Sequence, residues 1–129
     1  MSDYLFTYGT LQPGLAPFAL APIMRRLRLI GEGWVSGILY DFVHYPGAVL
    51  DEASTAKIFG TVYALPDDPE VLRPLDEYEE YDPSSPDTSQ YLRVLRPVIL
   101  AGGETLQCWV YHYNRNPGRA EIIASGRWG

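Results

Sequence analysis

The stretch YLFTYGTLQPG, residues 4–14, runs from aromatic and β-branched residues directly into a Gly-Thr pair and then a Pro-Gly pair. Its first half predicts a strand over Tyr4–Tyr8 that ends at Gly9. Two interpretations of the turn that follows are open. It is either an ordinary turn after a first strand, or a loop whose backbone N–H groups face one way and bind an anion. The rest of the chain supplies the context for this choice.

Other segments of β-branched and aromatic character predict about six strands joined mostly by hairpin-like connections. A short strand is expected after the turn His44–Gly47, and Gly102 and Gly103 are expected in the loop of a hairpin. The absence of βαβ repetition argues against a doubly wound nucleotide-binding sheet. The longer strands are predicted at Trp34–Phe42 with a bulge at Gly37, at Lys57–Leu65, at Tyr91–Leu100 and at Thr105–Asn114.

One region near the N-terminus predicts short helices. Residues 15–29 have helical spacing, but Pro17 and Pro22 interrupt it, so one or two short helical pieces are expected there. At the other end, residues 120–129 are too few to fold alone and are expected to dock on the body of the protein.

A second helical region is predicted at mid-chain. Asp68 can cap a helix whose first residue is Pro69. An interior proline costs roughly 3 kcal/mol, so we expect a break at Pro74 and a second short helix that continues to Glu79. Together these elements place the chain in the α+β class.

Composition limits the class of protein. The chain has 129 residues, of which 47% are hydrophobic and 20% charged, so a single domain covering residues 1–129 is expected. It contains 10 tyrosines against 4 phenylalanines. Because a buried tyrosine needs a hydrogen-bond partner for its hydroxyl, this excess indicates a core that carries a polar pocket.

The formal net charge of −6 argues against a nucleic-acid partner, and no long apolar stretch predicts a membrane span, so a cytoplasmic protein is expected. Cys108 is the only cysteine, which excludes an internal disulfide and a thiolate metal cluster; a buried, inert thiol is expected. His44 and His112 lack the spacing of metal ligands, and we expect no metal site.

The acidic run over residues 76–82 is the remaining candidate for chemistry. Helical spacing puts Asp76 and Glu79 on the apolar face, whereas Glu77 and Glu80 point another way. One interpretation is a solvated helix face. The other is an inward Glu79 carboxylate whose pKa is raised by desolvation first and by repulsion second, as a general base or acid requires.

Five motifs combine at this point: YGTLQPG, GILYDFVHYPG, LDEYE, YLR and WVY, in this order along nearly the whole chain. The ordered set resembles the γ-glutamylcyclotransferase-like family, which includes γ-glutamylamine cyclotransferase and the plant avirulence-induced proteins. The resemblance implies a small mixed barrel-like β-sheet. It also implies an enzyme that releases an amine or amino acid from a γ-glutamyl amide by cyclisation to 5-oxoproline, with no cofactor.

The resemblance also assigns roles to residues of this sequence. Glu79 closes the L-D-x-x-E motif and becomes the catalytic glutamate, and Glu80 stands where the family usually has glycine. Tyr91 becomes a wall of the pocket, and Arg93 of the same Y-x-R motif is interpreted as structural. The implied partner is a small-molecule γ-glutamyl substrate, and the implied protein is a monomer or weak homodimer. The turn that holds the glutamyl end of the substrate corresponds to Tyr8, Gly9, Thr10 and Leu11.

This assignment favours the anion-binding interpretation of the opening turn. Gly9 lacks a Cβ and lets the backbone approach the substrate carboxylate closely, which leaves the α-amine facing its own γ-carbonyl. Glu79 would take a proton from that amine and give one to the departing amine. Two alternatives stay open, a non-catalytic binding module on the same fold and another amide-cleaving enzyme with the same pocket. The presence of Glu79 favours the enzyme.

Overall fold

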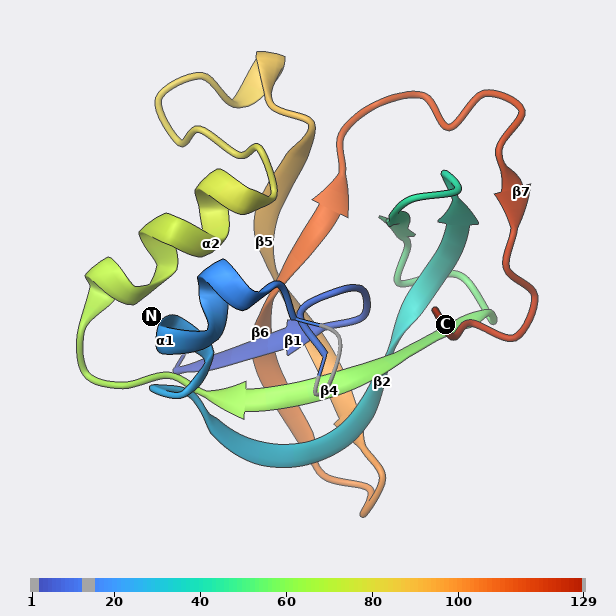
Figure 1. Ribbon diagram of the computed structural model, residues 1–129. Coiled ribbons are helices and arrows are strands. Elements are labelled where there is room, and N and C mark those ends of the chain that lie inside the picture. Colours follow the sequence, from blue (N-terminus) through green and yellow to red (C-terminus); the bar gives the residue numbers. More distant parts are fainter. Residues whose placement is uncertain (1–2, 13–15, 129) are drawn as a thin grey trace.

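Five strands close into a barrel in the computed structural model, which describes residues 3–12 and 16–128 (Figure 1). In order around the ring, the strands are β2 (Arg28–Asp41), β4 (Lys57–Ala64), β1 (Tyr4–Thr7), β6 (Thr105–Tyr113) and β5 (Tyr91–Leu100). Neighbours around the barrel are antiparallel except for β1 and β6, which run parallel. The ring closes where Gly33 and Trp34 of β2 pair with Leu100 and Ile99 of β5. The predicted mixed barrel-like sheet is therefore confirmed.

The strand β2 extends beyond the barrel. Its last residues pair on one side with β3 (Pro46–Leu50) and on the other with the short β7 (Glu121–Ile122). The pairing with β7 and a hydrogen bond from Ile123 N to Leu39 O confirm that the C-terminal tail docks on the body. Because β2 ends at Asp41 and β3 begins at Pro46, the turn covers residues 42–45, two residues earlier than the turn expected at His44–Gly47.

The predicted bulge at Gly37 is wrong. The irregularity of register between β2 and β4 lies between Leu29 and Gly31. At Gly37 the strand exchanges β4 for β3 as its partner, and a Cβ there would lie only 2.6 Å from Val49 O. Close approach of two backbones therefore explains this glycine. The strand also begins at Arg28, earlier than predicted.

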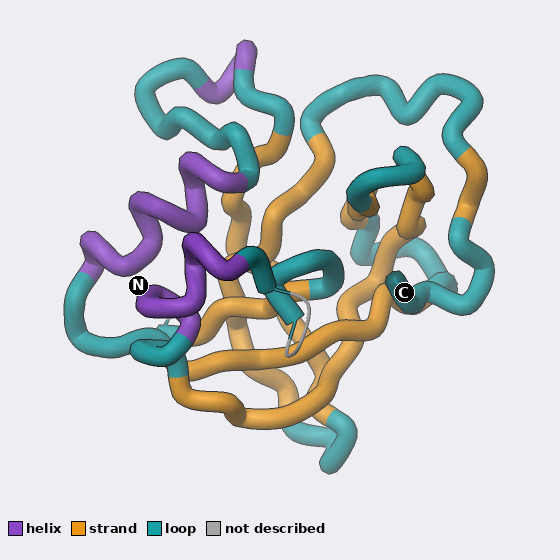
Figure 2. The backbone as a smooth tube through the Cα atoms, viewed as in Figure 1, coloured by secondary structure: helices purple, strands orange, loops and turns teal. Residues whose placement is uncertain are grey.

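Short helices cover one side of the barrel (Figure 2). The 3₁₀ turn η1 (Phe18–Leu20) leads into α1 (Ala21–Met24), and η2 (Pro69–Val71) leads into α2 (Leu72–Tyr78). A further 3₁₀ turn, η3 (Pro86–Thr88), lies in the loop before β5. These pieces confirm the short helical elements expected in both regions.

The prolines of the second helical region act differently from each other. Asp68 caps η2 as predicted, because its Oδ1 accepts a hydrogen bond from Glu70 N at 3.1 Å, and Pro69 opens the turn. The predicted break at Pro74 is wrong. Pro74 is the third residue of α2, where a missing N–H costs no hydrogen bond within that helix.

Buried side chains form two clusters that follow the alternation of the strands. One contains Phe6, Val62, Cys108 and Val110. The alternate residues of the same strands, such as Leu5, Tyr63 and Tyr111, belong to a second cluster with residues of η1, η2 and α2, and partly buried residues of α1 pack against it. Burial raises the pKa of the Cys108 thiol to about 12, which confirms the expected buried, inert cysteine.

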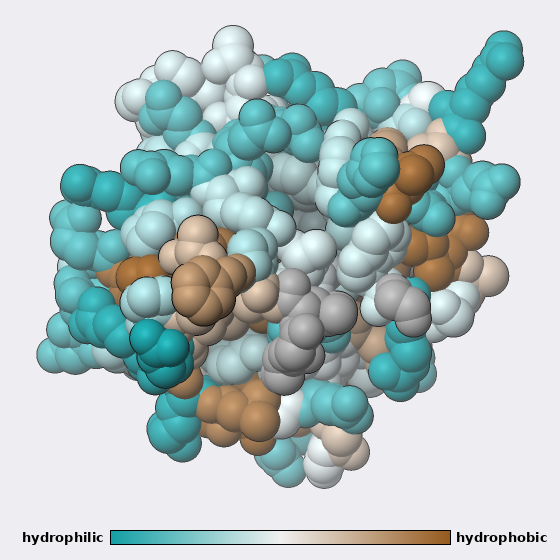
Figure 3. Space-filling model, viewed as in Figure 1, coloured by the Kyte–Doolittle hydropathy of each residue, from teal (hydrophilic) through white to brown (hydrophobic). Residues whose placement is uncertain are grey.

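The surface is mainly hydrophilic on the face drawn in Figure 3, where apolar atoms form small, separate patches. Phe18, Val43 and Leu29 are among the large apolar side chains that are exposed. Among the described residues, no helix has the length and apolar character needed to cross a membrane.

Candidate active site

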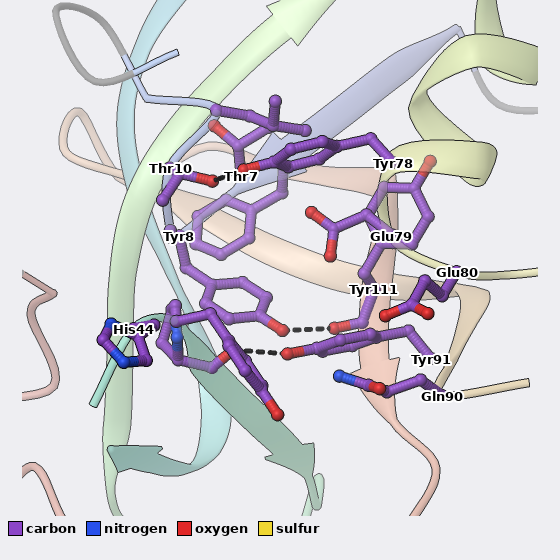
Figure 4. A pocket seen from close by; sticks show the side chains of 15 residues that line it. Thr7, Tyr8, Thr10, His44, Tyr78, Glu79, Glu80, Gln90, Tyr91 and Tyr111 are labelled. Atoms are coloured by element: carbon purple, nitrogen blue, oxygen red, sulfur yellow. Dashed lines mark hydrogen bonds between the residues drawn. The ribbon is translucent and has the colours of Figure 1, made fainter. Parts of the chain in front are cut away.

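A pocket of about 230 Å³ opens where the end of β1 faces the C-terminal end of α2 (Figure 4). The chain after β1, the loop before β3 and the start of β5 complete its walls. All six residues that the sequence assigned to a site line this pocket, although they come from three distant segments. The lining consists of Phe6, Thr7, Tyr8, Gly9, Thr10, Leu11, His44, Tyr45, Pro46, Tyr78, Glu79, Glu80, Gln90, Tyr91 and Tyr111.

The turn after β1 forms one wall of the pocket. It is closed by Gln12, whose N–H donates to Gly9 O at 3.3 Å and whose side chain donates to Tyr8 O at 3.0 Å. Within the described part of the chain, the N–H groups of Gly9, Thr10 and Leu11 donate no hydrogen bond. Three free donors in succession suit an anion. The Pro-Gly pair at 13–14, expected to close this stretch, lies outside the described residues.

Gly9 is explained by close packing. A Cβ on Gly9 would lie 2.9 Å from Pro46 Cγ, so any side chain would push the turn and the β3 segment apart. The φ angle of Gly9 lies outside the left-handed region, so the glycine is not needed for its backbone conformation. Thr10 fixes the other side of the turn, because its Oγ1 lies 2.5 Å from the hydroxyl of Tyr78 on α2.

Two buried tyrosines form the floor of the pocket. The Tyr8 hydroxyl donates to Tyr111 O at 2.7 Å and accepts from Ala48 N at 3.2 Å. The Tyr91 hydroxyl donates to Pro46 O at 2.6 Å. Burial raises the pKa of both phenols far above its usual value, and the nearby Glu79 carboxyl raises it further, so both hydroxyls stay neutral. These bonds link β1, β3, β5 and β6 and give the floor a fixed shape.

Glu79 provides the pocket with an unpaired carboxyl group. It follows α2 directly, its N–H donates to Leu75 O, and its side chain points into the pocket in Figure 4. The carboxyl is half-buried and makes no hydrogen bond or ion pair within the described part of the chain. Desolvation first, and repulsion by Asp76 second, raise its pKa from 4.5 to about 7. The direction of this pKa shift and its two causes agree with the expectation from helical spacing.

Asp76, one helical turn earlier, is fully engaged. Its carboxylate accepts from Arg93 Nε at 2.8 Å, from Arg93 Nη2 at 3.3 Å and from the Tyr111 hydroxyl at 2.7 Å. The guanidinium also lies over the Trp109 ring, 4.5 Å from its centroid. Arg93 is absent from the pocket lining, and this cluster anchors α2 on the β5–β6 hairpin. Of two carboxylates on one helix face, only Glu79 is left without a partner.

Several lining residues escaped the sequence analysis. Thr7 Oγ1 is buried with no hydrogen-bond partner in the described chain, and Tyr78, Tyr111 and His44 were not predicted at all. The excess of tyrosine was the signal for the aromatic members, since it indicated a polar pocket without locating it. Among residues 3–12 and 16–128, no three His, Cys, Asp or Glu side chains are grouped so that they could hold a metal ion.

A closed mixed barrel defines the class of site, with a pocket lined by the unpaired Glu79 carboxyl group and by a turn of free backbone N–H groups. Comparison with known proteins identifies the family of the chain. The model of the family described as "Gamma-glutamyl cyclotransferase, AIG2-like" matches residues 5–129. The chain belongs to this family.

Individual relatives agree with this assignment. A protein of Methanocaldococcus jannaschii named "Putative gamma-glutamylcyclotransferase" is 27% identical over 116 residues, which cover 90% of this chain and 88% of the relative. The solution structure of protein ytfP from Escherichia coli shares 27% identity with a TM-score of 0.65, over 97% of this chain and 95% of that one. An AIG2-like protein from Mus musculus shares the fold, with 23% identity and a TM-score of 0.69 over 90% of this chain and 80% of that one.

Proposed function

We propose that this protein cleaves γ-glutamyl amides by intramolecular cyclisation, which yields 5-oxoproline and a free amine. The observation that carries this proposal is the Glu79 carboxyl group, unpaired, half-buried and with a pKa of about 7 in the pocket. A carboxyl group that titrates near neutrality can both accept and return a proton. The family name and that of the archaeal relative support the same reaction class.

The pocket suits the two ends of a γ-glutamyl group. The free N–H groups of Gly9, Thr10 and Leu11 would hold the α-carboxylate, which needs no cation when several backbone donors converge on it. Among residues 3–12 and 16–128, no lysine or arginine lines the pocket. The α-ammonium would then face Glu79, and the unpartnered Thr7 hydroxyl is available to a substrate oxygen.

The reaction balances with one proton-transfer group. Glu79 removes a proton from the α-ammonium, and the neutral nitrogen attacks the γ-carbonyl carbon to form the ring bond. The amide C–N bond then breaks, and Glu79 returns the proton to the departing nitrogen. Glu79 next takes the second proton from the ring nitrogen, which leaves 5-oxoproline, and passes it to the released amine, which departs as an ammonium. Nucleophile and electrophile belong to one molecule, so holding it folded supplies much of the acceleration. The lining residues that the structure describes include neither serine nor cysteine, so the proposal uses no covalent intermediate on such a residue.

The test is release of 5-oxoproline from γ-glutamyl dipeptides and γ-glutamyl-lysine, compared between the parent, Glu79→Gln and Glu77→Gln. Glu77 is exposed and outside the pocket lining, so it controls for the lost charge. We expect a loss of about 10²–10⁴-fold in Glu79→Gln alone. Equal rates in the parent and Glu79→Gln would favour a binding module. Release of glutamate in place of 5-oxoproline would indicate an amide hydrolase.

A further inference from the structure

Glu80 is a charged residue at the pocket that the proposed reaction does not use. Its φ of 54° lies in the left-handed region, which glycine occupies at little cost and other residues rarely adopt. The backbone is fixed there, because Glu80 N donates to Glu77 O at 3.1 Å and Glu80 O accepts from Gln90 N at 3.0 Å. The side chain is exposed and makes no hydrogen bond or ion pair within the described residues. A free carboxylate is thus held at a defined position.

This position is the junction of two cavities. Glu80 lines the pocket that contains Glu79, and it also lines a neighbouring groove along the outer side of α2. Two arginines of that groove are already paired, Arg73 with Glu70 and Arg93 with Asp76. The remaining charged groups of the groove are carboxylates, those of Glu77, Glu80 and Asp82. Any group that leaves the pocket past Glu80 therefore enters a negative field.

The proposed binding mode sends the leaving amine toward this junction. In Figure 4, Glu79 lies between the end of the pocket at Thr10 and the end at Glu80 and Gln90. With the α-carboxylate at the turn and the reacting carbonyl at Glu79, the leaving amine extends toward Glu80. The Glu79 and Glu80 carboxyl groups are the acidic members of the lining, and no lysine or arginine in the described part of the chain lines the pocket to offset them.

We propose that Glu80 selects γ-glutamyl amides whose leaving amine carries a second, positively charged amino group, as in the mono-γ-glutamyl amides of aliphatic diamines. This inference rests on the proposed function and names the substrate class for it. The terminal ammonium of the leaving diamine pairs with the Glu80 carboxylate at the mouth of the pocket. An exposed aromatic ring, that of Tyr45, lines the same pocket and can also face a cation.

The test compares two substrates of equal length, the mono-γ-glutamyl amide of 1,4-diaminobutane and γ-glutamyl n-pentylamide, which replaces the terminal ammonium with a methyl group. The readout is the ratio of their kcat/KM values for 5-oxoproline release at low ionic strength. We expect the parent to prefer the charged amide about two- to fivefold, as an exposed ion pair allows. The ratio should fall to about one in Glu80→Gln and should decrease in the parent at high salt. Glu121→Gln, which loses the same charge outside both the pocket and the groove, should keep the ratio of the parent.

The outcomes separate this inference from the proposed function. If both amides release 5-oxoproline with equal kcat/KM in the parent, or if the preference persists in Glu80→Gln, the role of Glu80 is wrong and the reaction stands. If neither amide releases 5-oxoproline, the proposed reaction is wrong. The inference is then decided by calorimetric binding of both amides to the Glu79→Gln variant and to Glu79→Gln/Glu80→Gln. Tighter binding of the charged amide to the first variant only would support it, and equal or undetectable binding would overturn it.

Discussion

Replacing Glu79 with glutamine should change how stability depends on pH. Native Glu79 has a pKa of about 7, whereas the same group in the unfolded chain titrates near 4.5. Below 4.5 both states are protonated, and burial carries no charge penalty. Between these values the native state binds the extra proton, so rising pH lowers the free energy of unfolding. Above 7 the native protein holds an ionised carboxylate in a desolvated pocket, and the full penalty remains.

The two pKa values give the size of the effect. Their separation corresponds to about 3 kcal/mol at 1.36 kcal/mol per unit. Glutamine has the same shape and does not ionise, so Glu79→Gln should match the parent near pH 4.5 and exceed it by about 3 kcal/mol at pH 8. Other titrating groups are shared by both proteins and cancel in the difference.

Urea denaturation of the parent and Glu79→Gln at several pH values between 4.5 and 8 measures this difference. Glu77→Gln is the matched control, because it removes an exposed carboxylate from the same helix and should follow the parent throughout. Parallel stability curves for the parent and Glu79→Gln would refute a desolvated carboxyl group at this position. They would favour the other interpretation of the acidic run, in which Glu79 lies on a solvated helix face.

Further predictions concern the pH dependence of the reaction, the residues around Glu79 and the absence of a metal requirement. In the parent, kcat/KM for 5-oxoproline release should rise with pH through about 7; Asp76→Asn should move this midpoint to lower pH, because repulsion by Asp76 helps to raise the pKa. The same variant should lose about 3 kcal/mol of stability in urea, since Arg93 loses its charged partner. Gly9→Val should raise KM at least tenfold, whereas Thr10→Ser should alter it little; the reverse order would contradict a turn that binds through its N–H groups. Extensive chelation should leave the rate unchanged, and a loss restored by one divalent ion would show a metal requirement.

Local sequence patterns predicted the strands of the barrel because alternation and β-branched content act within a few residues. They could not predict its closure. The parallel pairing of Leu5 with Trp109 and the seam between Gly33 and Leu100 join segments that are distant along the chain. The error at Pro74 has a similar origin. Propensity penalises any interior proline, whereas the structure places this one in the first turn of α2.

In the site, too, features that depend on neighbouring residues could be predicted, whereas features that depend on residues distant along the chain could not. Helical spacing predicted that Glu79 points inward on the same side as Asp76, and the structure places it so, directly after the last residue of α2. The partner of Asp76 was not accessible, because Arg93 and Tyr111 lie on strands that meet α2 only in the folded protein. Thr7 was missed for another reason. In the sequence it is one more β-branched strand residue, and only the structure shows that its hydroxyl has no partner in the described chain.

The seam between β2 and β5 has a consequence for the order of folding. The β5–β6 hairpin forms from residues close in sequence, with Gly103 in its turn, and can assemble early. The seam consists of two residue pairs whose members are more than sixty positions apart, so closing it requires a large loss of chain entropy for few contacts. We expect the ring to close late, on the timescale of about milliseconds to seconds typical of non-local β-topologies. Until that step, the chain presents two open sheet edges, which makes the late intermediate the species most exposed to association with other chains.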